Sequence, residues 1–331
     1  MFQKRILQLF LFLLLPFHLL AVQVDTSLVR ILKMEVDTHR VMVLLRHSKN
    51  ISPNFPLQAR IYSGIAFREA AKLNCNYAMA EALIVKAKCY DISNELKNSL
   101  RINLEALSLS RRIKSPVLIA KSLRQLGGIY QALSKNEIAI VYLTASFNIS
   151  KRINYLKGVG SCYNDIGLTY MAQSQYTKAL IYLYNSLAVK FIIQDNLNIG
   201  NTYYLISRTY LEMGHYQKAM EYSLSSLRIL EKLNDIPGIL RSYQNIISIF
   251  IKIEDYQKAF YYINKAIAFM RKHNYYYSID DNLELIGNVL SKTNEPKIAI
   301  KWYKTALNNV HFKINLLLKS SLFSNLGTSY R

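Results

Sequence analysis

The chain has 331 residues, of which 51% are hydrophobic, with only 11 Gly and 6 Pro; this balance supplies apolar surface for a large core and excludes a disordered polymer. The formal net charge of +21 at pH 7 fits either basic, solvated helix faces or an anionic partner. The three cysteines, Cys75, Cys89 and Cys162, form no CxxC pair, so no disulfide framework is expected.

The first residues have the pattern of an export signal. Lys4 and Arg5 precede an apolar run over residues 6–22, which has the length of a signal-peptide core and is shorter than a comfortable transmembrane span of about 20 apolar residues. Cleavage after Ala21 is one expectation, and retention as an uncleaved anchor is the other, because Leu19 is bulky for the minus-three position. We therefore expect an exported, periplasmic or membrane-associated protein.

A 40-residue period runs from about residue 80 to the end of the chain. Its first marker is Leu126-Gly127 followed by Tyr130. The equivalent positions are Ile166, Gly167 and Tyr170; Ile206, Ser207 and Tyr210; Ile246, Ile247 and Phe250; Ile286, Gly287 and Leu290; and Leu326, Gly327 and Tyr330. The second marker, twelve residues after each small residue, is Ala139, Ala179, Ala219, Ala259 and Ala299. A repeat of this length indicates one supersecondary unit stacked many times.

Each unit is predicted to be a pair of helices. Residues 123–130 place apolar side chains at three- and four-residue intervals, turn formers follow at 134–136, and a second apolar stripe covers 138–147. Gly inside a helix costs about 0.5–1 kcal/mol relative to Ala, so Gly127 is expected where a facing helix approaches closely. The aromatic residue beside it is expected to fill the remaining gap.

The residues that begin each second helix resemble the tetratricopeptide repeat (TPR) family. They read Gln-Tyr-Thr-Lys-Ala at 175–179, His-Tyr-Gln-Lys-Ala at 215–219 and Asp-Tyr-Gln-Lys-Ala at 255–259, and the Leu-Gly-x-x-Tyr elements resemble the matching first-helix signature. The spacing exceeds the common repeat of about 34 residues and is similar to that of kinesin light chains and of bacterial regulatory and sensor TPR proteins. The resemblance implies an all-α fold, an α-solenoid of stacked antiparallel helix hairpins in a right-handed superhelix, with the extra residues in longer helix ends and in connectors such as 232–238.

This pattern predicts four segments along the chain. They are a signal peptide or anchor over 1–22, a divergent helical N-terminal cap over 23–79, six TPR-like repeats over 80–319, and the first helix of a truncated further repeat over 320–331. The last segment leads us to expect that the sequence is part of a longer protein.

No catalytic constellation is present in the sequence. It has no phosphate-binding glycine loop, no HExxH and no Gly-x-Ser-x-Gly element, and its six histidines are widely separated. We expect no enzyme activity, no cofactor and no metal site within these residues.

The resemblance implies a binding groove lined by the first helices. The groove-facing candidates are Arg124, Gln125, Asn164, Asp165, Tyr204, Arg208, Arg241, Gln244, Asn245, Glu284 and Asn288. In the long-repeat relatives an Asn before Leu-Gly often bonds the backbone of a bound peptide, and Asn245 and Asn325 match this pattern. A chaperone-tail clamp is disfavoured, since Gly128 and Asp165 stand where that clamp needs Asn.

Three functional hypotheses follow. The first is a non-catalytic scaffold that binds a peptide or protein on the concave face of the solenoid, and the positive charge would suit an acidic one. The second is the exported sensor region of a larger membrane signal-transduction protein, either a histidine kinase or a transcriptional regulator. Nucleic-acid binding through the positive charge is the third and weakest, since no nucleic-acid motif is present.

Overall fold

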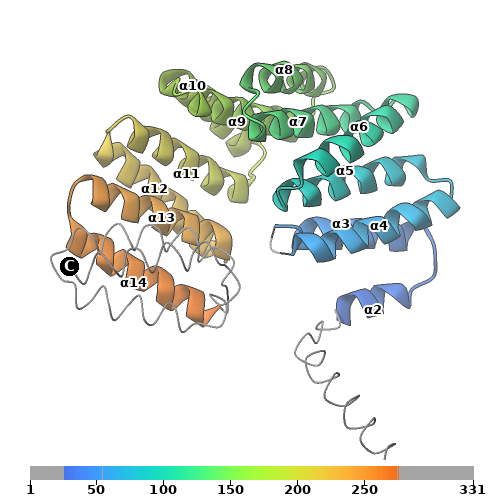
Figure 1. The fold of residues 1–331 in the computed structure, drawn as a ribbon, viewed down its shortest axis with the longest axis horizontal. Coiled ribbons are helices and arrows are strands. Elements are labelled where there is room, and N and C mark those ends of the chain that lie inside the picture. The colour runs from blue at the N-terminus through green and yellow to red at the C-terminus, as the bar shows by residue number, and fades with distance from the viewer. Residues whose placement is uncertain (1–25, 54, 274, 276–331) are drawn as a thin grey trace, which may run out of the picture. The chain divides into compact units, whose positions relative to one another are not determined.

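The computed structural model describes residues 26–53, 55–273 and 275, which form thirteen α-helices and no strand (Figure 1). The helices are α2 (Thr26–Leu32), α3 (Thr38–Ile51), α4 (Pro56–Lys72), α5 (Asn76–Ile92), α6 (Leu96–Arg112), α7 (Pro116–Ala132), α8 (Asn136–Arg152), α9 (Leu156–Ala172), α10 (Tyr176–Ile192), α11 (Asn196–Glu212), α12 (Tyr216–Lys232), α13 (Ile236–Lys252) and α14 (Tyr256–Lys272). From α4 onward every helix has 17 residues. The all-α prediction is confirmed.

The same three-residue turn joins every pair of helices from α4 to α14. Its middle residue is left-handed, with φ between 51° and 62° at the non-glycine positions and 77° at Gly214. At the end of α7, for example, Lys135 N donates to Tyr130 O at 2.8 Å and Ser134 N donates to Gln131 O at 2.8 Å. This is the Schellman arrangement, which satisfies the last carbonyls of a helix. The long connector predicted over 232–238 is therefore wrong, since α12 ends at Lys232 and α13 begins at Ile236; the extra residues lie in the helices.

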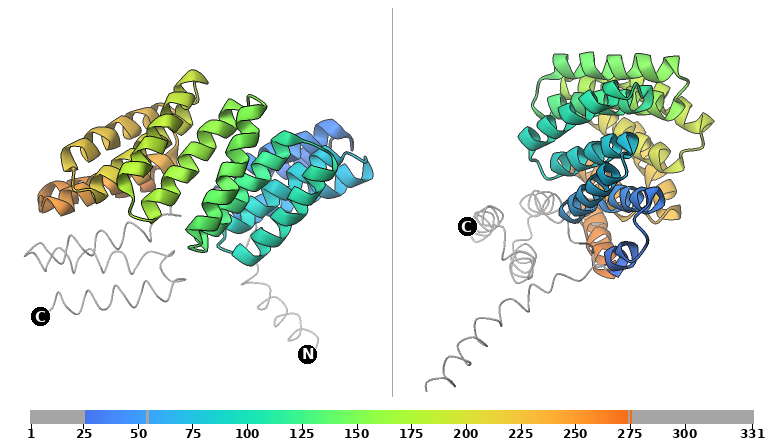
Figure 2. Two further views of the ribbon diagram at one scale, coloured as in Figure 1. Left: turned by 90° about the horizontal axis from the view of Figure 1, so that it is seen from above. Right: turned by 90° about the vertical axis from the view of Figure 1, so that its right-hand side faces the viewer.

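The helices form two compact units, which are described separately. Unit 1 ends at Gln125 and unit 2 begins at Leu126. In each unit consecutive helices pack together, as Figure 2 shows. In unit 1, α3 also contacts α5, and in unit 2, α11 also contacts α9 and α13. Successive odd-numbered helices therefore contact one another and make one layer of each unit, and the even-numbered helices pack against that layer.

The small residue of the first marker allows the two helices of a hairpin to approach closely. A Cβ placed on Gly127 would lie 2.5 Å from Leu143 Cγ and 3.2 Å from Ala139 O. At the equivalent positions of the third hairpin, Ser207 and Ser223 share a hydrogen bond of 2.6 Å between their hydroxyls. The predicted close approach is confirmed. The small residue of the first helix faces both the marker alanine of the second helix and the residue one turn after that alanine.

The aromatic residue of each first helix stacks on a ring of the second helix. The four pairs have centroid separations of 5.3 to 5.7 Å and interplanar angles of 3° to 26°: Tyr130 with Tyr142, Tyr170 with Tyr182, Tyr210 with Tyr222, and Phe250 with Tyr262. In the last three described hairpins a lysine ammonium also lies over the first ring, 5.3 to 5.7 Å from its centre: Lys178, Lys218 and Lys258. The Tyr-x-Lys-Ala element thus contributes a cation over the ring, a role that the sequence analysis did not assign.

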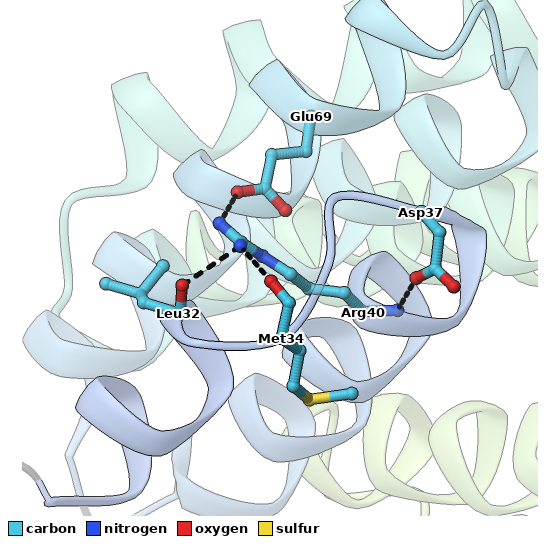
Figure 3. A network of polar contacts seen from close by, with 5 residues as sticks. All are labelled: Leu32, Met34, Asp37, Arg40 and Glu69. Carbon is cyan, nitrogen blue, oxygen red and sulfur yellow. Dashed lines mark hydrogen bonds and ion pairs between the residues drawn. The ribbon is translucent and has the colours of Figure 1, made fainter.

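A buried ion pair fastens the beginning of unit 1 (Figure 3). Asp37 caps α3 by accepting a 2.8 Å hydrogen bond from Arg40 N. The Arg40 guanidinium donates to Leu32 O at 3.1 Å and to Met34 O at 2.7 Å, and pairs with Glu69 of α4. The turn between α2 and α3 is thereby fixed to the first full-length helix.

Several predicted segments fall outside the described residues. They are the signal segment over 1–22, the repeats beyond residue 275 and the truncated segment over 320–331. The N-terminal cap over 23–79 and the other segment boundaries stay predictions, although α4 already has the length and turn of the regular helices.

Candidate partner-binding surface

The candidate groove residues all lie on odd-numbered helices where the structure describes them. Arg124 and Gln125 are on α7, Asn164 and Asp165 on α9, Tyr204 and Arg208 on α11, and Arg241, Gln244 and Asn245 on α13. Asn288, like Glu284 and Asn325, lies outside the described residues. Because α9, α11 and α13 belong to unit 2 and α11 contacts both of the others, the candidates from 164 to 245 lie on adjoining helices of one unit.

Two of the candidate amides bond to the preceding repeat of the chain itself. Asn245 is 5% exposed, and its Nδ2 donates to Tyr204 O at 3.2 Å and to Ser207 Oγ at 3.2 Å. Within unit 1, the Gln125 amide in the orientation that satisfies both its ends donates to Ile84 O at 3.1 Å and accepts from Lys88 N. Both amides thus reach a carbonyl 41 residues earlier, and we assign them to packing between repeats and not to a ligand backbone.

Asn164 takes part in a second contact between repeats. Lys190 of α10 is 5% exposed, and its ammonium donates to Asn164 Oδ1 at 3.0 Å and to Thr202 Oγ1 at 2.5 Å. Asn164 therefore links α9, α10 and α11. Asp165, its neighbour on α9, is half-buried.

The remaining four candidates form what we call the α11/α13 face: Tyr204, Arg208, Arg241 and Gln244, all half-buried. Arg241 donates to Asn201 Oδ1 at 2.8 Å, and its guanidinium lies 5.8 Å from the centre of the Tyr204 ring. Gln244 Nε2 is buried and has no hydrogen-bond partner among the described residues. The face thus combines two guanidinium groups, one ring and one unsatisfied amide donor, and none of its four side chains is a carboxylate.

In unit 1 a buried carboxylate, Glu81, pairs with two lysines of the neighbouring odd-numbered helices. Glu81 of α5 is 4% exposed and pairs with Lys49 of α3 at 2.7 Å and Lys121 of α7 at 3.1 Å. Burial raises the pKa of Glu81, but the two ammonium groups more than offset it, so the net pKa is lowered. Glu81 and Lys121 occupy the register of Asn201 and Arg241, so this position links successive first helices in both units.

The described residues contain no group of three His, Cys, Asp or Glu side chains able to hold a metal ion. Over the same part of the chain, no helix combines the length and hydropathy needed to cross a bilayer.

Comparison with known proteins identifies the repeat. A family model described as "Tetratricopeptide repeat" matches residues 158–232, which lie within α9 to α12. No curated protein sequence matches the chain.

Three solved structures illustrate the similarity of the fold. A signal transduction ATPase with numerous domains, which carries a tetratricopeptide repeat sensor and comes from Pyrococcus horikoshii, aligns with a TM-score of 0.67 at 17% identity, over 93% of this chain and 45% of that chain. A Rap protein complexed with competence and sporulation factor aligns at 0.58 and 12% identity, over 89% and 99%. Aspartyl phosphate phosphatase F from Bacillus subtilis aligns at 0.56 and 17% identity, over 90% and 85%.

At these identities the solved structures establish the fold alone. The family match over residues 158–232 covers the helices in which the markers, the stacked rings and the uniform turns recur. Residues 158–232 therefore match the tetratricopeptide repeat family, and the helices on either side of them share the same length and turn.

Proposed function

We propose that this chain is a non-catalytic scaffold that binds a peptide or protein segment on the α11/α13 face. The observation that carries the proposal is the grouping of the Tyr204 ring with the Arg208 and Arg241 guanidinium groups on two adjoining helices, where Gln244 Nε2 has no partner among the described residues. The two guanidinium groups offer a bound segment charge-assisted hydrogen bonds to its carbonyl or carboxylate oxygens, and such bonds are about twice as strong as neutral ones.

The chemistry of the face defines the partner. Arg208, Arg241 and Gln244 present donors, so the matching ligand presents backbone carbonyls or carboxylates. The Tyr204 ring adds a flat apolar contact of the kind that anchors interfaces. The Rap protein of the same fold, which was solved in complex with competence and sporulation factor, supports a polypeptide or similar ligand.

Selection from a phage-displayed random peptide library, followed by calorimetry, tests this proposal. Arg208→Ala and Gln244→Ala should each weaken the selected peptide by about fivefold or more, since anchor residues contribute more than about 1 kcal/mol. Arg228→Ala is the matched control, because Arg228 is exposed on α12, in the other layer. Unchanged affinity in both α11/α13 variants would refute the proposal.

The second candidate function is the sensor or input region of a larger signalling protein. It is supported by the fold shared with the ATPase that carries a repeat sensor, of which this chain covers 45%, and by the apolar run over residues 6–22. An immunoblot of the source cells should then show a protein larger than 38.3 kDa in the membrane or periplasmic fraction. A cytoplasmic band at or below that mass would eliminate this candidate.

A further inference from the structure

A tyrosine of one repeat lies against the stacked ring pair of the next hairpin. Tyr184 of α10 hydrogen-bonds through its hydroxyl to the Tyr210 hydroxyl at 3.0 Å and to the Tyr222 hydroxyl at 2.9 Å. Tyr210 and Tyr222 are the stacked ring pair of the α11–α12 hairpin. Burial and the two neighbouring hydroxyls raise the pKa of Tyr184, and its ring lies 6.3 Å from the Tyr222 ring in an edge-to-face contact.

Forty residues later the tyrosine is missing from the equivalent position. The positions equivalent to Tyr184, Tyr210 and Tyr222 carry Leu224, Phe250 and Tyr262. The structure has an open pocket of about 760 Å³ there. Its lining comes from α12, from the last turn of α13 with the turn that follows, and from α14: Tyr216, Gln217, Met220, Leu224, Ile249, Phe250, Ile253, Lys258, Tyr261 and Tyr262.

We propose that this pocket docks a tyrosine or phenylalanine side chain of a partner protein, in the place that Tyr184 occupies one repeat earlier. The receiving surface is aromatic, since Phe250 and Tyr262 stack with centroids 5.5 Å apart. The Tyr262 hydroxyl corresponds to the Tyr222 hydroxyl that bonds Tyr184. Aromatic pairs contribute beyond their buried area, and the chain itself demonstrates that a tyrosine fits this arrangement of helices.

The mouth of the pocket also has the character of a docking surface. Leu224, Ile253 and Tyr261 are 40%, 46% and 56% exposed, so three large apolar side chains surround one opening. The volume lies within the range of about 300–1,000 Å³ typical of ligand pockets. It exceeds that of one ring, so it accommodates the anchor ring together with an apolar neighbour from the partner.

The pocket is separate from the α11/α13 face. None of its lining residues belongs to that face, and its evidence is the comparison between two repeats of one chain. The two proposals therefore stand or fall independently.

The test uses the full chain labelled with 13C-methyl methionine and titrated with p-cresol, the analogue of a tyrosine side chain. Met220 lines the pocket, so its methyl resonance should shift on titration. Met213 occupies the position equivalent to Ile253, in the arrangement that contains Tyr184, and its resonance should not move. 4-Methylcyclohexanol, of similar size but without a π system, should bind about threefold to tenfold more weakly.

Two reciprocal substitutions make the assignment specific. Leu224→Tyr supplies the chain's own tyrosine and should abolish the Met220 response. Tyr184→Leu removes the tyrosine from the preceding arrangement and should create a new p-cresol response at Met213. If Leu224→Tyr does not fold, the Tyr184→Leu arm still decides the question.

Three results would overturn the proposal. They are no Met220 response in the unsubstituted chain, equal binding of the aromatic and saturated probes, or the absence of a Met213 response in a folded Tyr184→Leu chain. A last arm compares acetyl-Gly-Tyr-Gly-amide with acetyl-Gly-Ala-Gly-amide. Binding of p-cresol without binding of the tyrosine peptide would assign the pocket to free aromatic compounds, which would also overturn docking of a protein.

Discussion

Adding one methyl group at Gly127 should destabilise the first hairpin of unit 2, although alanine is the better helix former. The new Cβ would lie 2.5 Å from Leu143 Cγ, 2.6 Å from Leu143 Cδ2 and 3.2 Å from Ala139 O. Overpacking of this kind costs about 1–3 kcal/mol, and replacing a helical glycine returns about 0.5–1 kcal/mol. The difference is a net cost of about 0–2.5 kcal/mol, so we expect Gly127→Ala to lower the free energy of unfolding by about 1 kcal/mol.

The adjacent glycine is a matched control in the same helix. A Cβ on Gly128 would have no atom within 4 Å, so Gly128→Ala should stabilise the protein by about 0.5–1 kcal/mol. Urea denaturation followed by circular dichroism gives both midpoints. A second control is the Leu143→Ala background, which removes the clashing atoms and should relieve the cost of Gly127→Ala.

The two glycines separate a packing effect from helix propensity. If Gly127→Ala stabilised the chain as much as Gly128→Ala does, the close approach of α7 and α8 would be refuted. If Leu143→Ala gave no relief, the partner of Gly127 would have been misidentified.

Three further predictions concern single side chains. Glu81→Gln should lower the free energy of unfolding by about 1–2 kcal/mol at neutral pH. The pKa of Glu81 is lowered from 4.5 in the folded state, so the stabilisation by its carboxylate is lost as the pH falls below about 4.5. The difference in unfolding free energy between wild type and variant should therefore shrink in acid, and a constant difference would contradict the ion pairs. Burial raises the pKa of Cys89 to about 11, so a thiol reagent at about pH 8 should label half-buried Cys75 faster than Cys89 in the native protein. Equal labelling of Cys75 and Cys89 in mass spectrometry would contradict this. Tyr182→Leu removes the ring stacked on Tyr170 and should lower stability by about 0.5–1.5 kcal/mol in urea titration; an unchanged midpoint would contradict a stabilising stack.

The repeat and its helices were predictable because periodicity is a one-dimensional signal. The markers at Gly127 and Ala139 indicate one hairpin, and their recurrence every 40 residues indicates that the hairpin is repeated. The connector over 232–238 was mispredicted because Pro237 and Gly238 are loop formers in most contexts. Here Pro237 stands in the first turn of α13, where a backbone N–H would have no partner within the helix, so proline loses no hydrogen bond. Gly238 is buried against Leu230 and Asp235.

The candidate surface was harder to predict because its residues depend on neighbours about 40 positions away. Asn245 has the spacing of a ligand-binding residue, yet its amide bonds Tyr204 O in the preceding first helix. Nothing in the local pattern distinguishes that inward bond from an outward one. The pocket beside Leu224 was missed for a related reason, since it becomes visible only when Leu224 is compared with Tyr184 in three dimensions.

The central claim is that the helix pair of 40 residues, and not the single helix of 20, is the unit of packing, although the same turn recurs between all helices from α4 to α14. The most direct test deletes residues 196–235 in one variant and 196–215 in another, so that both keep the turn after α10 intact. Circular dichroism during urea titration should show that the longer deletion retains full helicity per residue and a cooperative transition, since α13 replaces α11 in register. The shorter deletion should lose cooperativity, because an even-numbered helix would enter the odd-numbered layer. Equal cooperativity in the two variants, or collapse of the longer deletion alone, would contradict the account.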